Sequence, residues 1–197
     1  MKLDSVFSGI GGQGIVALSD IFCEAALLDG FDVAKAEIHG MAQRGGSIVA
    51  HARIGEKIES PLIEYGKADV ILGFEILETA RVLPMLKEEG TVIMNAKYIP
   101  TTCTLSGSTK LKKPGDFVDL IRKKALKVHE IEGEGIATKL GNVLVVNTVL
   151  LGAFSALPEN PVNPDSYKKA IATRFKQKYV DLNLKAFQLG RESVTLA

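Results

Sequence analysis

The sequence predicts an α/β fold with an open, mostly parallel sheet and helices on both faces. Three observations carry this prediction. Apolar stretches of strand length alternate with stretches of helical periodicity along the 197 residues. The first apolar stretch leads through a glycine-rich turn directly into a helix, which is a Rossmann-like start. A further strand follows the second one without an intervening helix, which indicates a β-hairpin insertion. We expect residues 1–197 to form a single domain.

The elements of the N-terminal part are the most clearly marked. We expect a strand over Leu3–Ser8 and an amphipathic helix over Ile15–Leu28. Asp29-Gly30 ends that helix, because glycine readily adopts the left-handed conformation found at helix C-termini. Phe31–Ile38 follows as the second strand. Ser47–Ile54 then alternates in polarity and is the inserted strand or hairpin.

The middle of the chain continues the alternation of strands and helices. Asp69–Phe74 (DVILGF) is almost continuously apolar, as expected for a strand buried on both faces. Glu75 and Asn95 each follow a strand, at the edge where open α/β sheets place ligands. We expect Glu75 to be a solvated carboxylate or a helix N-cap, and Asn95 to line the same crevice. The other elements expected here are a helix over 76–89 that Pro84 kinks, a strand over 91–95, an edge strand over 101–108, a helix over 117–125 with Asp116 as its N-cap, and a strand over 126–131.

The C-terminal part, from Ile136 onward, is helical in pattern. Asn142–Leu157 is apolar on all sides, so we expect it to be buried in the chain or against a partner. Asn147 lies in this apolar segment and therefore needs a buried partner, such as the glycine-rich turn. Amphipathic helices over 165–175 and 179–190 complete the chain. The helices from about 142 to 190 should pack on the sheet.

Composition excludes several classes of function. The formal net charge of +1 argues against general electrostatic binding to nucleic acid or to an anionic membrane. No apolar stretch approaches the ~20 residues that span a bilayer, and residues 1–5 show no signal-peptide core, so we expect a cytoplasmic protein. Cys23 and Cys103 are the only cysteines, and an iron–sulfur cluster normally needs four thiolates. The histidines show no zinc-ligand spacing, so we predict no metal site.

The turn GIGGQG between the first strand and the first helix is the first candidate binding site. Its glycines satisfy G-x-G-x-x-G in the proper context, with a strand before and a helix after. Such a turn brings backbone N–H groups and the positive end of a helix dipole close to a phosphate. The candidate cofactor-binding residues in this turn are Gly9, Gly11, Gly12, Gln13 and Gly14.

A second candidate loop, HGMAQRGG, follows the second strand and covers residues 39–46. Arg44 carries a planar, permanently charged donor group that suits phosphate or carboxylate. Gly45 and Gly46 allow close approach of a ligand or of another chain. His39 could titrate near neutrality, although a structural role is the simpler interpretation.

Together the two motifs resemble the gamma subunit or domain of 2-oxoacid:ferredoxin oxidoreductases (pyruvate, ketoisovalerate and indolepyruvate types). HGMAQRGG is most similar to the indolepyruvate branch, in which this domain is the small beta subunit. The resemblance extends over SIVAHARIG, DVILGFE and the helix NVLVVNTVLLGAF, and so from the first strand to at least Phe154. It implies membership of an assembly that oxidatively decarboxylates a 2-oxoacid, which in the indolepyruvate branch is an arylpyruvate, to acyl-CoA and reduces ferredoxin.

The resemblance also implies a division of labour between subunits. Thiamine diphosphate and iron–sulfur clusters are expected on a large partner subunit, through which ferredoxin is reached. The G-D-G motif of thiamine enzymes is absent, because Gly115-Asp116 is followed by Phe117. This chain is therefore expected to have no catalytic residues and to be inactive alone. Its expected roles are assembly and binding of coenzyme A, whose pyrophosphate suits the glycine turn and Arg44.

Two alternatives remain open at this point. The chain could be a self-contained NAD(P)- or flavin-dependent oxidoreductase, with Glu37 at the end of the second strand bonding the ribose. It could instead be a pure assembly module in which the glycines only permit close packing. Exposed apolar surface between Leu144 and Phe154 would allow the isolated chain to form a homodimer.

Overall fold

A six-stranded sheet forms the centre of the molecule, in the order β2-β3-β1-β4-β5-β6. The computed structural model describes residues 1–40, 45–100 and 113–195. Strands β1, β4, β5 and β6 pair in parallel, whereas β3 is antiparallel to both of its neighbours. The strands are β1 (Leu3–Ile10), β2 (Asp32–His39), β3 (Ser47–Gly55), β4 (Ala68–Gly73), β5 (Leu86–Asn95) and β6 (Lys127–Ile131). The predicted α/β fold and its inserted hairpin are confirmed.

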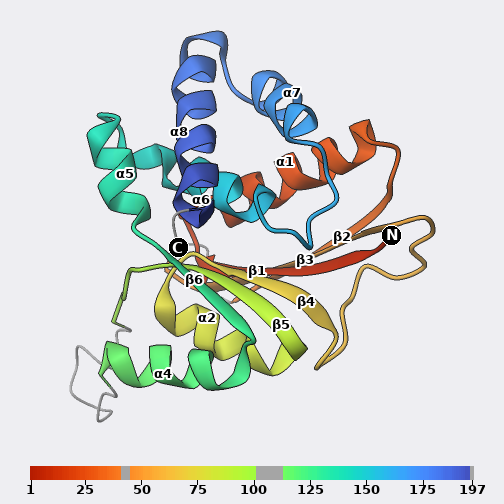
Figure 1. Ribbon diagram of the computed structural model, residues 1–197, viewed down its shortest axis with the longest axis vertical. Coiled ribbons are helices and arrows are strands. Elements are labelled where there is room, and N and C mark those ends of the chain that lie inside the picture. Colours follow the sequence, from red (N-terminus) through yellow and green to blue (C-terminus); the bar gives the residue numbers. More distant parts are fainter. Residues whose placement is uncertain (41–44, 101–112, 196–197) are drawn as a thin grey trace.

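The helices cover both faces of the sheet (Figure 1). On one face lie α1 (Ile15–Leu28), α6 (Val146–Ser155), α7 (Pro164–Arg174) and α8 (Gln177–Thr195). On the other face lie α2 (Ile76–Val82) and α4 (Pro114–Lys124). Among the described residues, the 3-10 turn η1 (Leu83–Met85) leads from α2 into β5, and the short helix α5 (Gly133–Lys139) and the 3-10 turn η2 (Val143–Val145) lead from β6 into α6.

An aromatic cluster fills the core on the α1 face. The rings of Phe22 and Phe154 meet edge to face with centroids 5.0 Å apart, and Phe7 on β1 lies 5.5 Å from Phe154. Tyr167 of α7 stacks on Phe22 from the other side. All four side chains are fully buried. This cluster fixes α1 and α6 on β1, and so positions the turn between β1 and α1.

Two glycines let α6 and α8 cross in close contact. A Cβ on Gly152 would lie 2.0 Å from the carbonyl oxygen of Phe187, and one on Gly190 would lie 1.9 Å from that of Val149. Side chains at these positions would force the helices apart. The apolar segment predicted over Asn142–Leu157 is accordingly buried inside the chain from Thr148 to Ser155. Of the range expected to expose apolar surface, Leu144 is 80% exposed, whereas the chain itself covers the part from Thr148 onward.

Several predicted boundaries need correction. The helix expected over 76–89 ends at Val82, because Pro84 lies in the 3-10 turn that follows and the buried Leu86 already pairs with Ala68 in the sheet. Asp116 is not the N-cap of α4. It lies in the first turn, where its carboxylate accepts the N–H of Lys113 at 2.8 Å.

Two further boundaries differ in the C-terminal half. Helix α5 starts at Gly133, because Asn95 Oδ1 accepts the Gly133 N–H at 3.1 Å. Helix α8 continues through Gly190 to Thr195. The edge strand expected over 101–108 lies outside the described residues.

Candidate functional site

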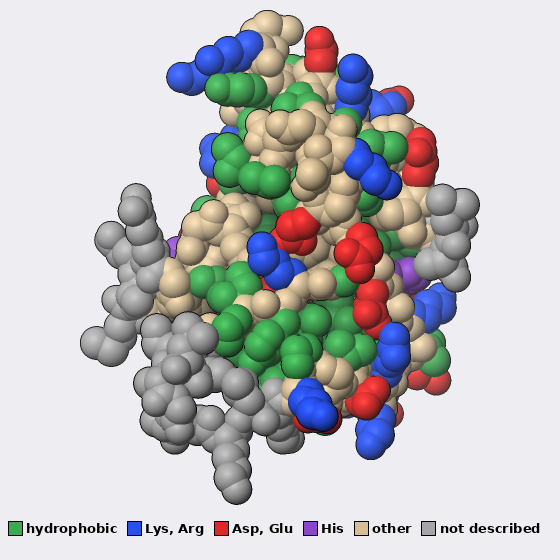
Figure 2. Space-filling view, turned by 90° about the vertical axis from the view of Figure 1, so that its left-hand side faces the viewer, with side chains coloured by type: hydrophobic (Ala, Val, Ile, Leu, Met, Phe, Trp, Pro, Cys, Tyr) green, Lys and Arg blue, Asp and Glu red, His purple; other side chains and the backbone are tan. Residues whose placement is uncertain are grey.

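A pocket of about 380 Å³ opens at the carboxyl ends of the parallel strands, beside the turn from β1 to α1. Figure 2 views the molecule from this side, where acidic and basic side chains lie beside a group of hydrophobic ones. We call this hollow the glycine-loop pocket. Its lining residues are Gly12, Gln13, Gly14, Phe74, Asn95, Lys97, Glu134, Val143, Leu144, Val146 and Asn147.

The glycine turn is braced from within by Gln13. Its side-chain oxygen accepts the N–H of Ile10 at 2.7 Å, while its own N–H donates to the Ile10 carbonyl at 3.1 Å. A Cβ on Gly9 would come within 2.6 Å of that side-chain oxygen. Gly9 is therefore needed for packing, and the amide oxygen of Gln13 is already used within the turn.

The N-terminus of α1 is left open toward the pocket. Gly14 is its N-cap, in the left-handed conformation with φ 86°, and no side chain caps the helix. Gly12 also has a positive φ of 102°. The N–H groups of Gly12 and Gly14 have no acceptor among the described residues, and the first turn carries no acidic side chain. Open N–H groups and a helix dipole in this arrangement favour an anion.

The two predicted loops meet at their glycines. The Gly11 N–H donates to the Gly46 carbonyl at 2.8 Å, and the Gly45 N–H reaches the Gly11 carbonyl at 3.5 Å. The two motifs are thus in direct backbone contact through the residues that the structure describes. Arg44, the predicted phosphate partner, lies outside the described residues.

Glu37 lies away from the glycine turn. Strand β3 separates β2 from β1, so Glu37 is opposite Ala50 rather than beside the first strand. Its carboxylate binds Lys35 at 2.6 Å and His39 at 3.0 Å. The bond with Lys35 lowers the pKa of Glu37. A nicotinamide dinucleotide site needs its acidic residue on the strand next to β1, so this geometry does not favour the dinucleotide alternative.

An ion pair forms one wall of the pocket. Lys97 and Glu134 are joined at 2.8 Å, on the segment after β5 and at the start of α5. Burial opposes ionisation of Glu134, but the bonds with Lys97 and Asn95 outweigh it and lower the pKa. Asn95 also holds Gly133 and the carbonyl of Phe74, which confirms its predicted place in this crevice. Lys97 and Glu134 were not singled out from the sequence; they lie two residues after the end of β5 and three residues after the end of β6, respectively.

Glu75 is the helix N-cap that the sequence indicated. It is fully buried and accepts the N–H groups of Leu77 at 3.0 Å and Ile99 at 3.3 Å, as well as that of Glu78. Burial raises its pKa, and these backbone bonds oppose the rise. Glu75 therefore holds the start of α2 rather than facing the pocket.

Apolar side chains surround the mouth of the pocket. Val143 and Leu144 in η2 are 60% and 80% exposed, which is high for residues of this type. Asn142 caps this turn by accepting the Leu144 N–H at 3.0 Å. A flat apolar group of a ligand, or a partner chain, would therefore find an apolar surface to pack against at the mouth.

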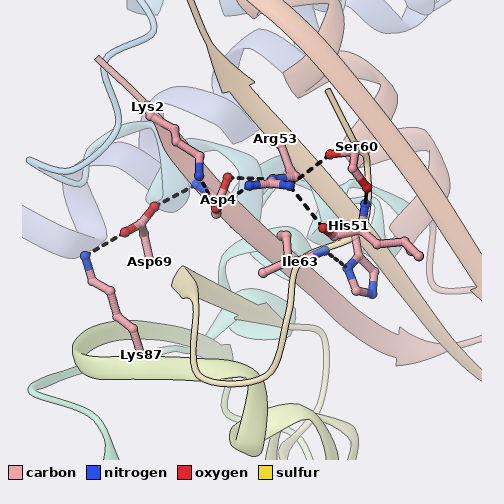
Figure 3. Close-up of polar contacts among 9 residues, drawn as sticks. Lys2, Asp4, His51, Arg53, Ser60, Ile63, Asp69 and Lys87 are labelled. Atoms are coloured by element: carbon pink, nitrogen blue, oxygen red, sulfur yellow. Dashed lines mark hydrogen bonds and ion pairs between the residues drawn. The ribbon is translucent and has the colours of Figure 1, made fainter. Parts of the chain in front are cut away.

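A second hollow, of about 460 Å³, lies at the opposite end of the sheet. Figure 3 shows its chain of ion pairs: Lys87 binds Asp69 at 2.6 Å, and Arg53 binds both carboxylate oxygens of Asp4 at 2.9 and 3.1 Å. Asp69 also accepts the Asp4 N–H. Arg53 donates further to the carbonyls of residues 60 and 62. These contacts hold the connection between β3 and β4 in place, and they leave the carboxylates of Asp4 and Asp69 already paired.

Other features of the described residues bear on the sequence predictions. Burial raises the pKa of Cys23 to about 12, as for a structural thiol; Cys103 lies outside the described residues. Within the described ranges no cluster of three His, Cys, Asp or Glu side chains has an arrangement that could hold a metal ion. Nor does any helix in the described part have the length and apolar character needed to cross a membrane.

Comparison with known proteins agrees with the resemblance of the two motifs. The family model for pyruvate ferredoxin/flavodoxin oxidoreductase matches residues 4–193. Indolepyruvate oxidoreductase subunit IorB of Methanothermobacter thermautotrophicus is 38% identical over 190 residues, covering 96% of each chain.

Solved structures share the fold. The keto/oxoacid ferredoxin oxidoreductase gamma subunit from Geobacter sulfurreducens matches over 99% of each chain, with a TM-score of 0.73 and 25% identity. A 2-oxoglutarate:ferredoxin oxidoreductase from Magnetococcus marinus, with 2-oxoglutarate, coenzyme A and succinyl-CoA bound, has a TM-score of 0.76 at 18% identity. All of this chain aligns with 31% of that longer chain. The chain belongs to the pyruvate ferredoxin/flavodoxin oxidoreductase family.

Proposed function

We propose that this chain is the non-catalytic subunit of a 2-oxoacid:ferredoxin oxidoreductase complex. The complex oxidatively decarboxylates an arylpyruvate to its acyl-CoA and reduces ferredoxin. This chain assembles with a large subunit and helps to bind coenzyme A in the glycine-loop pocket. Thiamine diphosphate and the iron–sulfur clusters belong to the large subunit. The observation that carries the proposal is the uncapped N-terminus of α1 at the glycine-loop pocket, in a chain of this family.

The donor set of the pocket fits the pyrophosphate of coenzyme A. The N–H groups of Gly12 and Gly14 are free among the described residues, and Lys97 lines the same pocket with an ammonium group. A phosphate would compete with Glu134 for Lys97, because their pair is 45% and 37% exposed. Charge-assisted bonds of this kind are about twice as strong as neutral ones.

The apolar mouth fits the rest of the same molecule. Val143 and Leu144 are exposed next to the phosphate-binding wall. They would cover the adenine ring or the pantetheine arm, which are the apolar parts of coenzyme A. The coenzyme A named with the Magnetococcus marinus enzyme agrees with this choice of ligand.

The assignment to the arylpyruvate branch rests on sequence. The motif HGMAQRGG resembles that branch, and a relative named as an indolepyruvate oxidoreductase subunit aligns along nearly the whole chain. The second loop begins beside β2 and meets the glycine turn through Gly46. A branch-specific loop at this position suits contact with the large subunit.

Reconstitution tests the proposed function. The chain is co-expressed with its large partner, and ferredoxin reduction is measured with indolepyruvate or pyruvate in the presence of coenzyme A. We expect no activity from either chain alone, and a higher kcat/KM for indolepyruvate in the complex. Full activity of the large subunit alone would contradict the role given to this chain. A preference for pyruvate would contradict the arylpyruvate assignment only.

A further inference from the structure

Strand β2 is a free edge of the sheet. It is the first strand in the order, its one neighbour among the described strands is β3, and it runs for eight residues. An edge strand presents unpaired backbone N–H and C=O groups, which form a template for another strand. The opposite edge strand, β6, has five residues. Strand β2 is therefore the longer of the two templates.

The two faces of β2 differ in chemistry. Lys35 and Glu37 point to the α1 face, because Lys35 binds Asp20 on α1 at 2.5 Å and Glu37 at 2.6 Å. Ala34, Ala36 and Ile38 alternate with them and therefore point to the other face. Ile38 is 52% exposed there. Strand β2 thus combines one positive and one negative side chain on one face with small and apolar ones on the other.

We propose that two copies of this chain pair through β2, in antiparallel register about a two-fold axis at Ala36. This register places Lys35 opposite Glu37 of the second copy and Glu37 opposite its Lys35. Ile38 faces Ala34 of the second copy on the other face. Opposite charges directly across an antiparallel pair are stabilising, and each pair occurs twice because of the symmetry.

Charge excludes the neighbouring symmetric registers. In a symmetric antiparallel pair, the residues directly opposite each other belong to the same face of the sheet. The two-fold axis therefore always passes beside one residue, and the neighbouring registers have the axis at the residue before or after Ala36. An axis at Lys35 would place the two Lys35 side chains against each other, and an axis at Glu37 would do the same for two carboxylates. Like charges directly opposite are destabilising. With the axis at Ala36, both contacts join opposite charges.

The apolar surface beside β2 supports the same occupant. On the face away from α1, a hollow of about 400 Å³ is lined by Ile38, Val49, Leu62 and Tyr65 among others. Leu62 and Tyr65 are 54% and 79% exposed. The two-fold axis stands perpendicular to the sheet, so the same apolar face of the second copy would lie alongside this surface across β2. Apolar contact would then add to the backbone bonds of the strand pair.

The pairing leaves the proposed site free. The two β2 strands run in opposite directions, so the glycine-loop pockets of the two copies lie at opposite ends of the joined sheet. Each copy can then bind its own large subunit. This inference is independent of coenzyme A binding, since it uses another edge of the molecule.

Charge complementation between variants tests the pairing. Lys35→Glu makes both positions acidic, and Glu37→Lys makes both basic, so each variant should repel itself across the axis. A mixture of the two restores an opposite-charge pair at every contact. By sedimentation, the full chain should dimerise, each variant alone should dimerise about tenfold or more weakly, and the mixture should recover the affinity.

The mixture also controls for folding. Lys35→Glu loses the contacts of Lys35 with Asp20 and Glu37 inside its own chain, and Glu37→Lys loses the contact between Lys35 and Glu37. These losses are the same in the mixture as in each variant alone, so mixing cannot rescue a purely structural defect. A monomeric unmodified chain, or a mixture as weak as the single variants, would overturn the proposal.

Cross-linking gives a second readout that involves no charge change. Ala36→Cys lies on the axis and should form an intermolecular disulfide under oxidation. Ile38→Cys is the matched control, because its two copies would lie about 14 Å apart. Equal cross-linking at both positions would contradict the register.

Discussion

Asn147 on α6 lies directly against Gly14 at the start of α1. A Cβ on Gly14 would be 2.7 Å from the side-chain nitrogen of Asn147, whose oxygen is bonded to the N–H of Thr148 at 2.8 Å. The contact joins the glycine turn to the buried helix α6. From the sequence, the amide of Asn147 was expected to need a buried partner such as this turn. It also leaves the Asn147 nitrogen at the wall of the glycine-loop pocket.

Replacing Gly14 should therefore be more damaging than replacing Gly12. Gly14→Ala combines a positive φ with the contact to Asn147 and should lower the free energy of unfolding by about 2 kcal/mol. Gly12→Ala meets no atom within 4 Å and should cost about 1 kcal/mol from its φ alone. Urea unfolding of both variants measures the difference. Adding Asn147→Ala to Gly14→Ala should recover part of the loss, and an absence of coupling would count against the contact.

The close crossing of α6 and α8 predicts a strong effect at Gly190. Gly190→Ala would place a methyl group against the Val149 carbonyl and should destabilise the chain by about 3 kcal/mol. Gly115→Ala, in the first turn of α4 with open space around it, is the control and should be neutral or slightly stabilising. Thermal unfolding that ranks the two variants in the other order would contradict the packing of α6 on α8.

His51 makes stability depend on pH. Burial, helped by Arg53, lowers its pKa from the ordinary value of 6.5. The unfolded chain therefore takes up a proton below pH 6.5 that the folded chain resists, so stability is present above that value and is lost as pH falls toward the folded pKa.

The variant His51→Asn isolates this effect. Its side-chain oxygen can accept the Ile63 N–H, which His51 Nδ1 accepts at 3.0 Å, but it does not titrate. We expect the melting temperature to fall less between about pH 7 and pH 5 in the variant than in the unmodified chain. A parallel decline would show that His51 does not contribute. His129, whose pKa is also lowered by burial, accounts for part of the remaining slope.

The ion pair at the amino end of the sheet should be costly to break from one side. In Arg53→Met, the carboxylate of Asp4, whose side chain is 5% exposed, keeps only Lys2 at 2.9 Å. Removing one partner of a buried pair typically costs about 3–5 kcal/mol, and the remaining Lys2 contact reduces our expectation to about 2 kcal/mol. Adding Asp4→Asn should recover part of this loss. Additive losses in a double-mutant cycle would contradict the coupling.

Local sequence signals predicted much of this fold. The helix Ile15–Leu28 has the expected bounds, because a glycine turn before it and Asp29-Gly30 after it mark both ends. The insertion of β3 between β1 and β2 was not predictable, since strand order depends on long-range pairing. The role of Gly190 was not predictable either. In the sequence this glycine resembles a helix end, whereas in the structure it allows the close contact between α8 and α6.

The candidate site was predicted in part, for a similar reason. The glycine turn, Asn95 and Asn147 were found from the strand–turn–helix pattern and from a polar residue in an apolar helix. Lys97 and Glu134 were missed, because their pairing joins two segments that the sequence separates.

Coenzyme A affinity of the assembled complex tests the central claim most directly. Gly12→Asp and Gly12→Asn introduce side chains of the same shape into open space beside the uncapped end of α1, and only the first is charged. By isothermal titration, the Asp variant should bind coenzyme A about tenfold or more weakly than the Asn variant, from repulsion of the phosphates. The KM for the oxoacid should be the same in both. Equal coenzyme A affinity of the two intact complexes would contradict a phosphate site at the glycine turn.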